Sequence, residues 1–188
     1  MPFLYSLAVA VAKAMTPVVA KSAKTKAFVA GRKALWTQLK GIPQNKKVVW
    51  MHCASLGEYE QGLPVLSALK NNHPEHFYLV TFFSPSGYEV RKNHGIADLA
   101  TYLPWDTRAD VKRFVALVNP VMALLVKYEF WPNLIREVQR QNTPLFLITG
   151  LFRQHQRFFK PWGNSQRKLL HGFTHLFVQN KASEKLLQ

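Results

Sequence analysis

The sequence predicts an α/β domain in which a Rossmann-like parallel sheet carries helices on both faces. From Val48 onward, short runs rich in β-branched and aromatic residues alternate with amphipathic stretches, as in βαβ units. Most strand candidates are continuous apolar runs, which is typical of parallel strands covered on both faces. The predicted strands are Val48–His52, Tyr78–Phe83, Ala100–Leu103, Val121–Val126, Leu145–Thr149 and Leu176–Gln179.

The helices between these strands are predicted from amphipathic spacing and from residues that begin or end helices. Asp106 and Thr107 are residue types that cap a helix N-terminus, and Pro132 stands where a first-turn proline is tolerated. Asn119-Pro120 and Thr143-Pro144 each indicate the end of a helix before a strand. The predicted helices are Glu60–Asn71, Gly87–His94, Arg108–Val118, Pro132–Gln141, Trp162–His171 and one that begins at Ala182.

Length, cysteine content and charge limit what the chain can be. A chain of 188 residues with 48% hydrophobic residues suits one large α/β domain with an appendage and excludes a disordered protein. The single cysteine, Cys53, excludes an internal disulfide and a cysteine-based zinc cluster. The net charge of +15 favours a polyanionic partner: nucleic acid, an anionic membrane or a phosphorylated substrate. Composition alone favours nucleic acid.

Residues 1–45 are predicted to form a basic, partly apolar helical arm, and residues 46–188 to form the Rossmann-like domain. No acidic residue precedes Glu58, whereas nine lysines and arginines lie between positions 13 and 47. Phe3–Ala20 is apolar, but Lys13 and Pro17 interrupt it, so it is marginal as a spanning helix. An interfacial helix on a membrane surface is favoured. The alternative is an ordinary terminal helix that packs on the domain.

Candidate site residues follow the first predicted strand, because ligands of open α/β sheets bind at the carboxyl ends of strands. Ser55 and Gly57 lie in this loop, where Gly57 permits a tight turn or a close ligand approach. Glu58 stands at the mouth of the next helix, whose N-terminus favours an ionised carboxylate, the form that a general base needs. The spacing fits equally well a carboxylate that only stabilises its helix. No GxGxxG dinucleotide pattern is present.

Ser84, Ser86 and Gly87 follow the second predicted strand and offer hydroxyl and backbone N–H groups that could hold an anion or a sugar hydroxyl. A simple capped turn explains them at least as well. Lys127 and Glu129 end the fourth strand, and they point to the same side if the chain is still extended there.

The remaining aromatic and basic candidates lie in later loops. For Trp131 and Pro132, at the start of a helix, core packing is the favoured interpretation. Arg153 and Arg157 follow the fifth strand, and their guanidinium groups match phosphate or carboxylate. No metal site is predicted, because the lone histidines lack ligand spacing: His52, His155, His171 and His175.

Four motifs occur in an order that resembles the N-terminal domain of the transferases of 3-deoxy-D-manno-octulosonic acid (Kdo) in Gram-negative lipopolysaccharide synthesis. They are HCASLGE, TFFSPSG, YLPWD and KYEFWPNLI, and the resemblance covers about Val48 to Asn180. The basic apolar arm before them resembles the family's membrane-associating N-terminus. The resemblance implies the N-terminal, acceptor-binding half of a GT-B glycosyltransferase, with the donor-binding domain beyond Gln188.

The resemblance also implies a reaction: an inverting transfer of Kdo from CMP-Kdo to a lipid A precursor, without a cofactor, at the cytoplasmic face of the inner membrane. The protein would be peripheral or N-terminally anchored there. Glu58 matches the family's catalytic base. Glu129 matches the glutamate of the family's E-x-W-P-N-like element. Lys127 stands two positions before it, where many members have an acidic residue, and a lysine could stabilise the departing phosphate instead. The alternative is a basic, non-catalytic α/β module that binds an anionic membrane or nucleic acid. The motifs make nucleic acid the less favoured partner.

Overall fold

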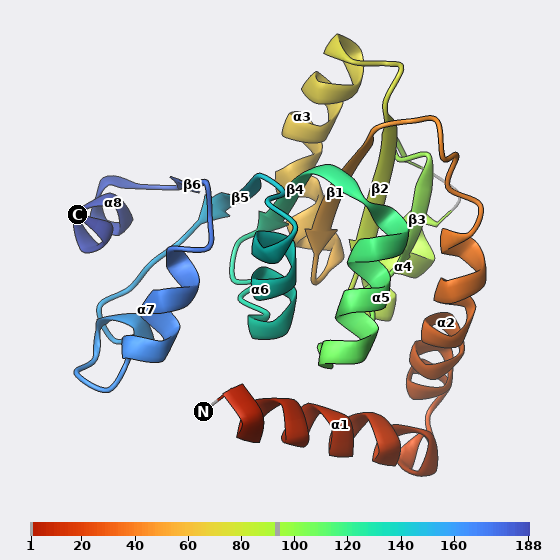
Figure 1. Ribbon diagram of the computed structural model, residues 1–188, viewed down its shortest axis with the longest axis horizontal. Helices are drawn as coiled ribbons and strands as arrows, with labels where there is room; N and C mark the ends of the chain where they lie inside the picture. The colour runs from red at the N-terminus through yellow and green to blue at the C-terminus, as the bar shows by residue number, and fades with distance from the viewer. Residues whose placement is uncertain (1, 93–94) are drawn as a thin grey trace.

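The computed structural model describes residues 2–92 and 95–188 and contains one six-stranded parallel sheet (Figure 1). The strands follow the order β3-β2-β1-β4-β5-β6. From β1 the chain adds β2 and β3 on one side, and it then returns to add β4, β5 and β6 on the other, so the strand order reverses between β1 and β4. The predicted Rossmann-like fold is confirmed, and every predicted strand agrees with its counterpart to within one residue at each end. The strands are β1 (Val48–Cys53), β2 (Phe77–Phe82), β3 (Leu99–Tyr102), β4 (Pro120–Val126), β5 (Leu145–Gly150) and β6 (His175–Val178).

The described helices agree with the prediction in number and order after β1, with three starts shifted by more than one residue. The helix after β1 begins at Leu56 instead of Glu60, because Ser55 is its extended N-cap, and Glu58 therefore lies in its first turn. The next helix begins at Pro85, and its predicted end, His94, lies outside the described residues. The helix that precedes β6 starts after Gly163 rather than at Trp162. The helices are α1 (Pro2–Val19), α2 (Ala23–Leu39), α3 (Leu56–Asn72), α4 (Pro85–Arg91), α5 (Arg108–Val118), α6 (Pro132–Arg140), α7 (Asn164–Leu170) and α8 (Lys181–Leu187).

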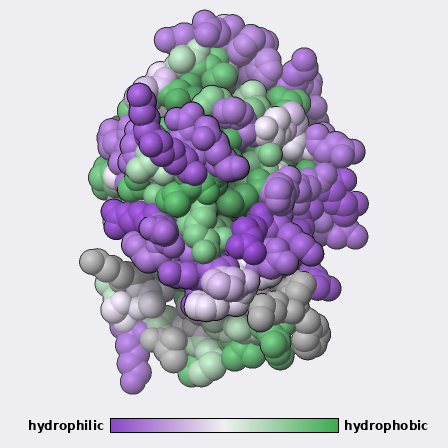
Figure 2. All heavy atoms as spheres, turned by 90° about the vertical axis from the view of Figure 1, so that its left-hand side faces the viewer, coloured by the Kyte–Doolittle hydropathy of each residue, from purple (hydrophilic) through white to green (hydrophobic). Residues whose placement is uncertain are grey.

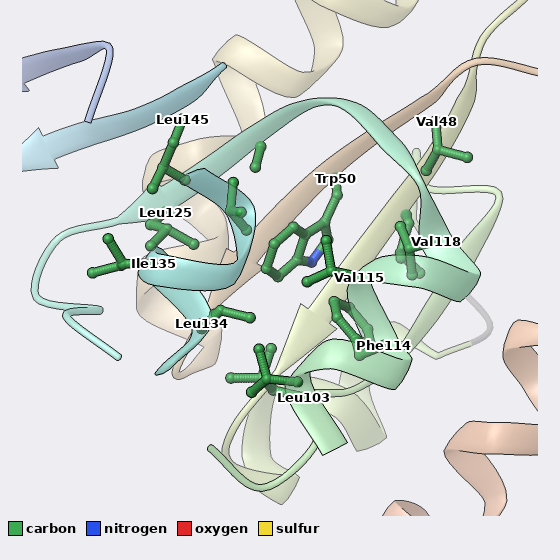
Figure 3. Packing of buried hydrophobic residues seen from close by; sticks show 14 of the residues in the cluster. Val48, Trp50, Leu103, Phe114, Val115, Val118, Leu125, Leu134, Ile135 and Leu145 are labelled. Atoms are coloured by element: carbon green, nitrogen blue, oxygen red, sulfur yellow. The ribbon is translucent and has the colours of Figure 1, made fainter. Parts of the chain in front are cut away.

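Two hydrophobic clusters, one on each face of the sheet, form the core. Alternate residues of β1 enter different clusters: Trp50 belongs to the cluster that contains residues of α2, α5, α6 and α7, whereas Met51 belongs to the cluster that contains residues of α3. The Trp50 ring lies 5.0 Å from the ring of Phe114, at the centre of the first cluster (Figure 3). The sheet is therefore covered on both faces, as the apolar strands indicated.

Helix α2 belongs to this core, although the sequence places it in the arm. Leu35, Leu39 and Ile42 join the same cluster as Trp50. Arg32, one of the arm's basic residues, is buried, and its guanidinium lies 3.6 Å from the centre of the Phe28 ring. In the sequence, the lysines on the exposed face of α2 made the whole segment look like a basic arm. The predicted arm therefore consists of two parts, because α2 packs into the core cluster whereas no described residue of α1 belongs to it.

Helix α1 lies across the side of the molecule where the strands end (Figure 1). Lys13 forms an ion pair of 2.5 Å with Asp110 in the first turn of α5, and Ser6 is hydrogen bonded to Asn133 in the first turn of α6. Both of those helices start from loops at the carboxyl edge of the sheet. Among the helices of residues 2–92 and 95–188, none combines the length and the apolar character that a membrane crossing requires.

Asp106 ties the loop after β3 to the start of α6. Its two carboxyl oxygens accept the backbone N–H groups of Asn133 and Leu134 at 3.1 and 2.9 Å. The sequence suggested that Asp106 or Thr107 caps the helix that follows them. Thr107 does so, by accepting the Asp110 N–H at 3.2 Å, whereas Asp106 caps a helix further along the chain.

We expect Asp106→Asn to lower the free energy of unfolding by about 1–3 kcal/mol, because one of the two buried N–H groups loses its acceptor. Burial raises the pKa of Asp106 from 3.8 to about 6, even though the backbone N–H groups oppose this shift. Stability from the raised pKa is complete below about pH 4 and is lost as the pH rises through 6. The difference between wild type and variant, measured by denaturant unfolding, should therefore grow between pH 7 and pH 5. A difference that does not depend on pH would contradict this role.

Candidate functional site

The carboxyl ends of β1, β2 and β4 meet around His52, at the point where the strand order reverses. Open α/β sheets bind ligands at this kind of switch point. His52 is fully buried, and its Nε2 lies 2.9 Å from Oε2 of Glu129. The indole N–H of Trp131 donates to the same carboxylate oxygen at 2.5 Å. Glu129, only 7% exposed, is thus held from two sides.

Glu58 reaches this cluster from the first turn of α3. One of its oxygens accepts the backbone N–H of Ala54 at 2.5 Å, which folds the side chain back over the junction of strand and helix. Ser55 is the N-cap, but its hydroxyl makes no capping hydrogen bond. Gly57 has no positive φ, and a side chain there would meet nothing within 4 Å, so the tight turn suggested by the sequence does not occur. The space at Gly57 is open.

The surroundings drive the two glutamates toward opposite protonation states. Burial raises the pKa of Glu58, and the negative charge of Glu129 raises it further, against smaller opposing effects of Ala54, His52 and Lys127. Burial also opposes ionisation of Glu129, but the hydrogen bond and charge of His52 and the Trp131 N–H outweigh it and hold that pKa below its usual range. Glu129 is therefore the resident anion, and Glu58 is the stronger base of the two.

Lys127, whose charge acts on Glu58, has an unusual backbone conformation. Strand β4 ends at Val126, and Lys127 has a φ of 64° while its N–H donates to the Ile148 carbonyl at 3.0 Å. The chain is therefore no longer extended at Lys127, and the condition under which Lys127 and Glu129 would point to the same side is not met. Thr149, at the end of the neighbouring strand β5, also has a positive φ, of 54°. Such conformations are rare for β-branched residues and occur preferentially at functional sites.

The start of α4 adjoins the start of α3. The Ser84 N–H donates to the Ala54 carbonyl at 2.8 Å, and the Ser84 hydroxyl accepts the Ser86 N–H at 3.3 Å. A side chain at Gly87 would come within 2.4 Å of the Phe82 ring, so glycine permits this close approach. The capped turn that the sequence suggested is present, and it places both serines next to the loop that leads to Glu58.

Arg153 and Arg157 lie apart from the glutamates. Arg157 lines a cavity of about 700 Å³ with Arg136 and His155, between the start of α1 and α7. The Arg153 N–H donates to the Gln156 side chain at 2.9 Å. In residues 2–92 and 95–188, neither guanidinium forms an ion pair or hydrogen bond with Glu58 or Glu129. The structure thus separates these two candidates from the main cluster.

Three residues of the cluster were missed in the sequence: His52, Thr81 and Trp131. A lone histidine in a strand is more often structural, and Trp131 was assigned to core packing. Trp131 does stack on Phe83, with ring centres 5.1 Å apart, but its N–H serves Glu129. The signal available for His52 was its position, since it ends an apolar strand directly before the loop that carries Glu58.

One group of side chains has the spacing of metal ligands. His73, Glu75 and His76 offer ligand atoms that all lie within 4.8 Å of one another. They precede β2 and so lie at the amino edge of the sheet, opposite to the glutamates, and His73 and Glu75 are exposed. The sequence prediction of no metal site rested on other histidines, namely His52, His155, His171 and His175.

A family model and curated relatives both identify this chain as similar to one transferase family. Residues 29–188 match the family model described as 3-deoxy-D-manno-octulosonic-acid transferase (kdotransferase). The transferase of that name from Aquifex aeolicus is 42% identical over 91 residues, which cover 48% of this chain and 25% of that protein. The one from Haemophilus influenzae is 31% identical over 103 residues, which cover 54% of this chain and 24% of that protein. This chain thus spans about a quarter of the length of these relatives.

A solved structure is similar in fold. It is a putative UDP-N-acetylglucosamine 2-epimerase from Listeria monocytogenes, with a TM-score of 0.54 and 14% sequence identity. The match covers 77% of this chain and 42% of that one. At this identity the likeness supports the Rossmann-like fold alone.

Proposed function

This chain belongs to the 3-deoxy-D-manno-octulosonic acid (Kdo) transferase family, and we propose that it is the acceptor-binding half of an inverting GT-B glycosyltransferase that moves Kdo from CMP-Kdo to a lipid A precursor. The observation that carries the proposal is the pair of glutamates at the switch point of the sheet, of which Glu58 is the stronger base. The proposed activity is that of the full-length protein, because this chain spans about a quarter of its relatives.

In the proposed reaction Glu58 acts as the general base. Its carboxylate takes the proton from an acceptor hydroxyl while that oxygen attacks the anomeric carbon of Kdo. The new bond between oxygen and carbon forms as the bond from carbon to the phosphate oxygen breaks, and CMP leaves. One displacement inverts the configuration. A raised pKa suits this role, because it makes Glu58 a better proton acceptor than an ordinary surface glutamate.

The neighbouring polar residues are proposed to hold the substrates. Ser55, Ser84 and Ser86, with the open space at Gly57 and the close turn at Gly87, offer hydroxyl and N–H groups to the acceptor sugar. The Lys127 ammonium, beside Glu58, would stabilise the phosphate as CMP departs. The cavity lined by Arg157, with Arg153 in the same loop, is proposed to take an acceptor phosphate. The proposed step uses no metal or cofactor.

Helix α1 supports a peripheral location on an anionic membrane, with the active site facing the lipid. Large hydrophobic side chains follow helical spacing along its exposed side, namely Leu4, Leu7, Val11, Met15 and Val18, each at least 49% exposed. The lower end of Figure 2, where α1 lies, shows hydrophobic atoms beside hydrophilic ones. Exposed Lys21, Lys26 and Lys33 follow on the connection and on α2, so apolar burial and charge attraction occur together. Since α1 lies at the edge of the sheet that carries Glu58, docking would bring the site to the lipid.

We expect Val11→Glu to weaken binding to anionic vesicles by about tenfold or more, because it removes apolar burial and adds a repelled charge. Val65→Glu, an equal change at an exposed position of α3, is the matched control and should bind as wild type does. Wild-type binding should weaken with rising salt but persist, because salt does not screen the apolar contribution. Co-sedimentation at low and high salt measures both effects. Equal binding of the two variants, or preference for an oligonucleotide over vesicles, would refute the membrane proposal.

The catalytic proposal is tested by assaying transfer from CMP-Kdo to a lipid A precursor with the full-length protein. Comparing wild type with Glu58→Gln decides whether the glutamate cluster performs the reaction.

A further inference from the structure

We infer that His52 and Thr81 are positioning residues, which hold the Glu129 carboxylate as an anion beside Glu58 and so set the strength of the base. The inference rests on the proposed function, in which Glu58 accepts the proton. Neither residue is placed to touch a substrate, since both are fully buried. His52 and Thr81 would therefore affect the basicity of Glu58 only through the charge of Glu129.

A chain of hydrogen bonds runs from the core to Glu129. The indole N–H of Trp50 donates to the Thr81 hydroxyl oxygen at 2.9 Å. Because that oxygen already accepts from Trp50, its own hydrogen can point to Nδ1 of His52, which lies 2.9 Å away. The ring proton is then on Nε2, which donates to Glu129 at 2.9 Å.

The second contact of the ring leads to the same result. Nδ1 of His52 also lies 3.0 Å from the Thr81 carbonyl, to which a protonated ring would donate. In the neutral ring whose Nδ1 accepts from the Thr81 hydroxyl, and in the protonated ring, Nε2 bears a hydrogen directed at Glu129. The Thr81 hydroxyl therefore favours this tautomer, and the two contacts with Thr81 orient the ring in a site that is closed to bulk solvent.

The charge of Glu129 acts on Glu58. The titratable groups around Glu58 are Glu129 and Lys127 from the end of β4 and His52 from β1, and buried Cys53 faces both glutamates. Burial alone would favour a protonated, neutral Glu129, which the hydrogen bonds from His52 and Trp131 prevent. As long as Glu129 stays ionised, its field favours the protonated form of Glu58. Loss of the His52 N–H would leave only the Trp131 N–H to oppose the effect of burial, so the ionised form of Glu129 would be less favoured and Glu58 would become a weaker base.

The experiment compares His52→Leu, which removes the N–H donor, with His52→Gln, whose amide N–H can replace it. In each full-length variant, ¹³C NMR of labelled glutamate follows the titration midpoint of Glu58, with Glu58→Gln and Glu129→Gln to assign the signals. The midpoint should fall in His52→Leu and in Glu129→Gln, and it should stay near the wild-type value in His52→Gln. Thr81→Val should lower the midpoint and Thr81→Ser should not, which provides a second pair if His52→Leu does not fold.

Transfer kinetics supply the second readout. His52→Leu should lower kcat by about 10²-fold, because Glu58 becomes a weaker base, with little change in KM for the acceptor. The acid limb of its pH–rate profile should move to lower pH. An unmoved Glu58 midpoint in both His52→Leu and Thr81→Val would overturn the inference. Failure of the proposed function has a different signature, namely full transfer by Glu58→Gln, and it leaves the titration result unaffected.

Discussion

Replacement of Glu58 by glutamine is expected to lower the rate of Kdo transfer by about 10²–10⁴-fold, the usual contribution of a general base. Glutamine keeps the size of the side chain, and its amide oxygen can still accept the Ala54 N–H, so α3 should begin as in wild type. The loss should therefore fall on kcat, while the thermal unfolding temperature changes little. Initial rates with CMP-Kdo and a lipid A precursor measure it.

Glu60→Gln is the matched control for this variant. Glu60 lies one half-turn further along α3, is exposed and pairs with Arg91 on the surface. Its replacement should leave kcat within about twofold of wild type, since exposed ion pairs contribute little. In wild type, kcat/KM should fall as the pH drops through the raised pKa of Glu58. A Glu58→Gln enzyme that is as fast as Glu60→Gln would remove Glu58 from the mechanism.

The second large effect concerns stability. We expect Leu35→Ala to lower the free energy of unfolding by about 2–5 kcal/mol, because Leu35 is 0% exposed in the cluster that also contains Trp50. Leu7→Ala, on the exposed side of α1, should change it by no more than about 0.5 kcal/mol. Denaturant unfolding of both variants makes the comparison.

Truncation extends the same comparison. Removal of residues 1–20 should leave the domain folded, since α2 and its buried leucines remain. Removal of residues 1–42 should unfold it, because Leu35, Leu39 and Ile42 leave the core together. A stable, cooperatively folding fragment from residue 43 onward would show that α2 is an appendage after all.

The parts of the fold that depend on local sequence could be predicted. Apolar runs between turn residues located each strand within one residue, and α5 has the predicted bounds, Arg108–Val118, because Thr107 caps it and Asn119 ends it in a left-handed conformation. The proximity of Glu129 and Lys127 to Glu58 could be predicted because parallel strands bring their carboxyl ends together. Family resemblance then supplied their proposed roles.

The remaining features depend on contacts between distant residues. His52 meets Glu129 across 77 positions of sequence, and Asp106 caps α6 from 27 positions away, and no local pattern indicates either contact. The apolar face of α2 was masked by its lysines. The left-handed conformation at Lys127 was missed because strand propensity gives no sign of where the extended chain must turn.

The most direct test of the account is transfer itself. The full-length protein, CMP-Kdo and a lipid A precursor are incubated together, and mass spectrometry and nucleotide analysis follow the products. We predict that CMP and Kdo-modified lipid form in equal amounts, with inverted anomeric configuration, in wild type and in Glu60→Gln, and that both products nearly vanish in Glu58→Gln. The proposed function is contradicted if wild type leaves the lipid A precursor unmodified, and the role of Glu58 is contradicted if Glu58→Gln forms the product at the wild-type rate.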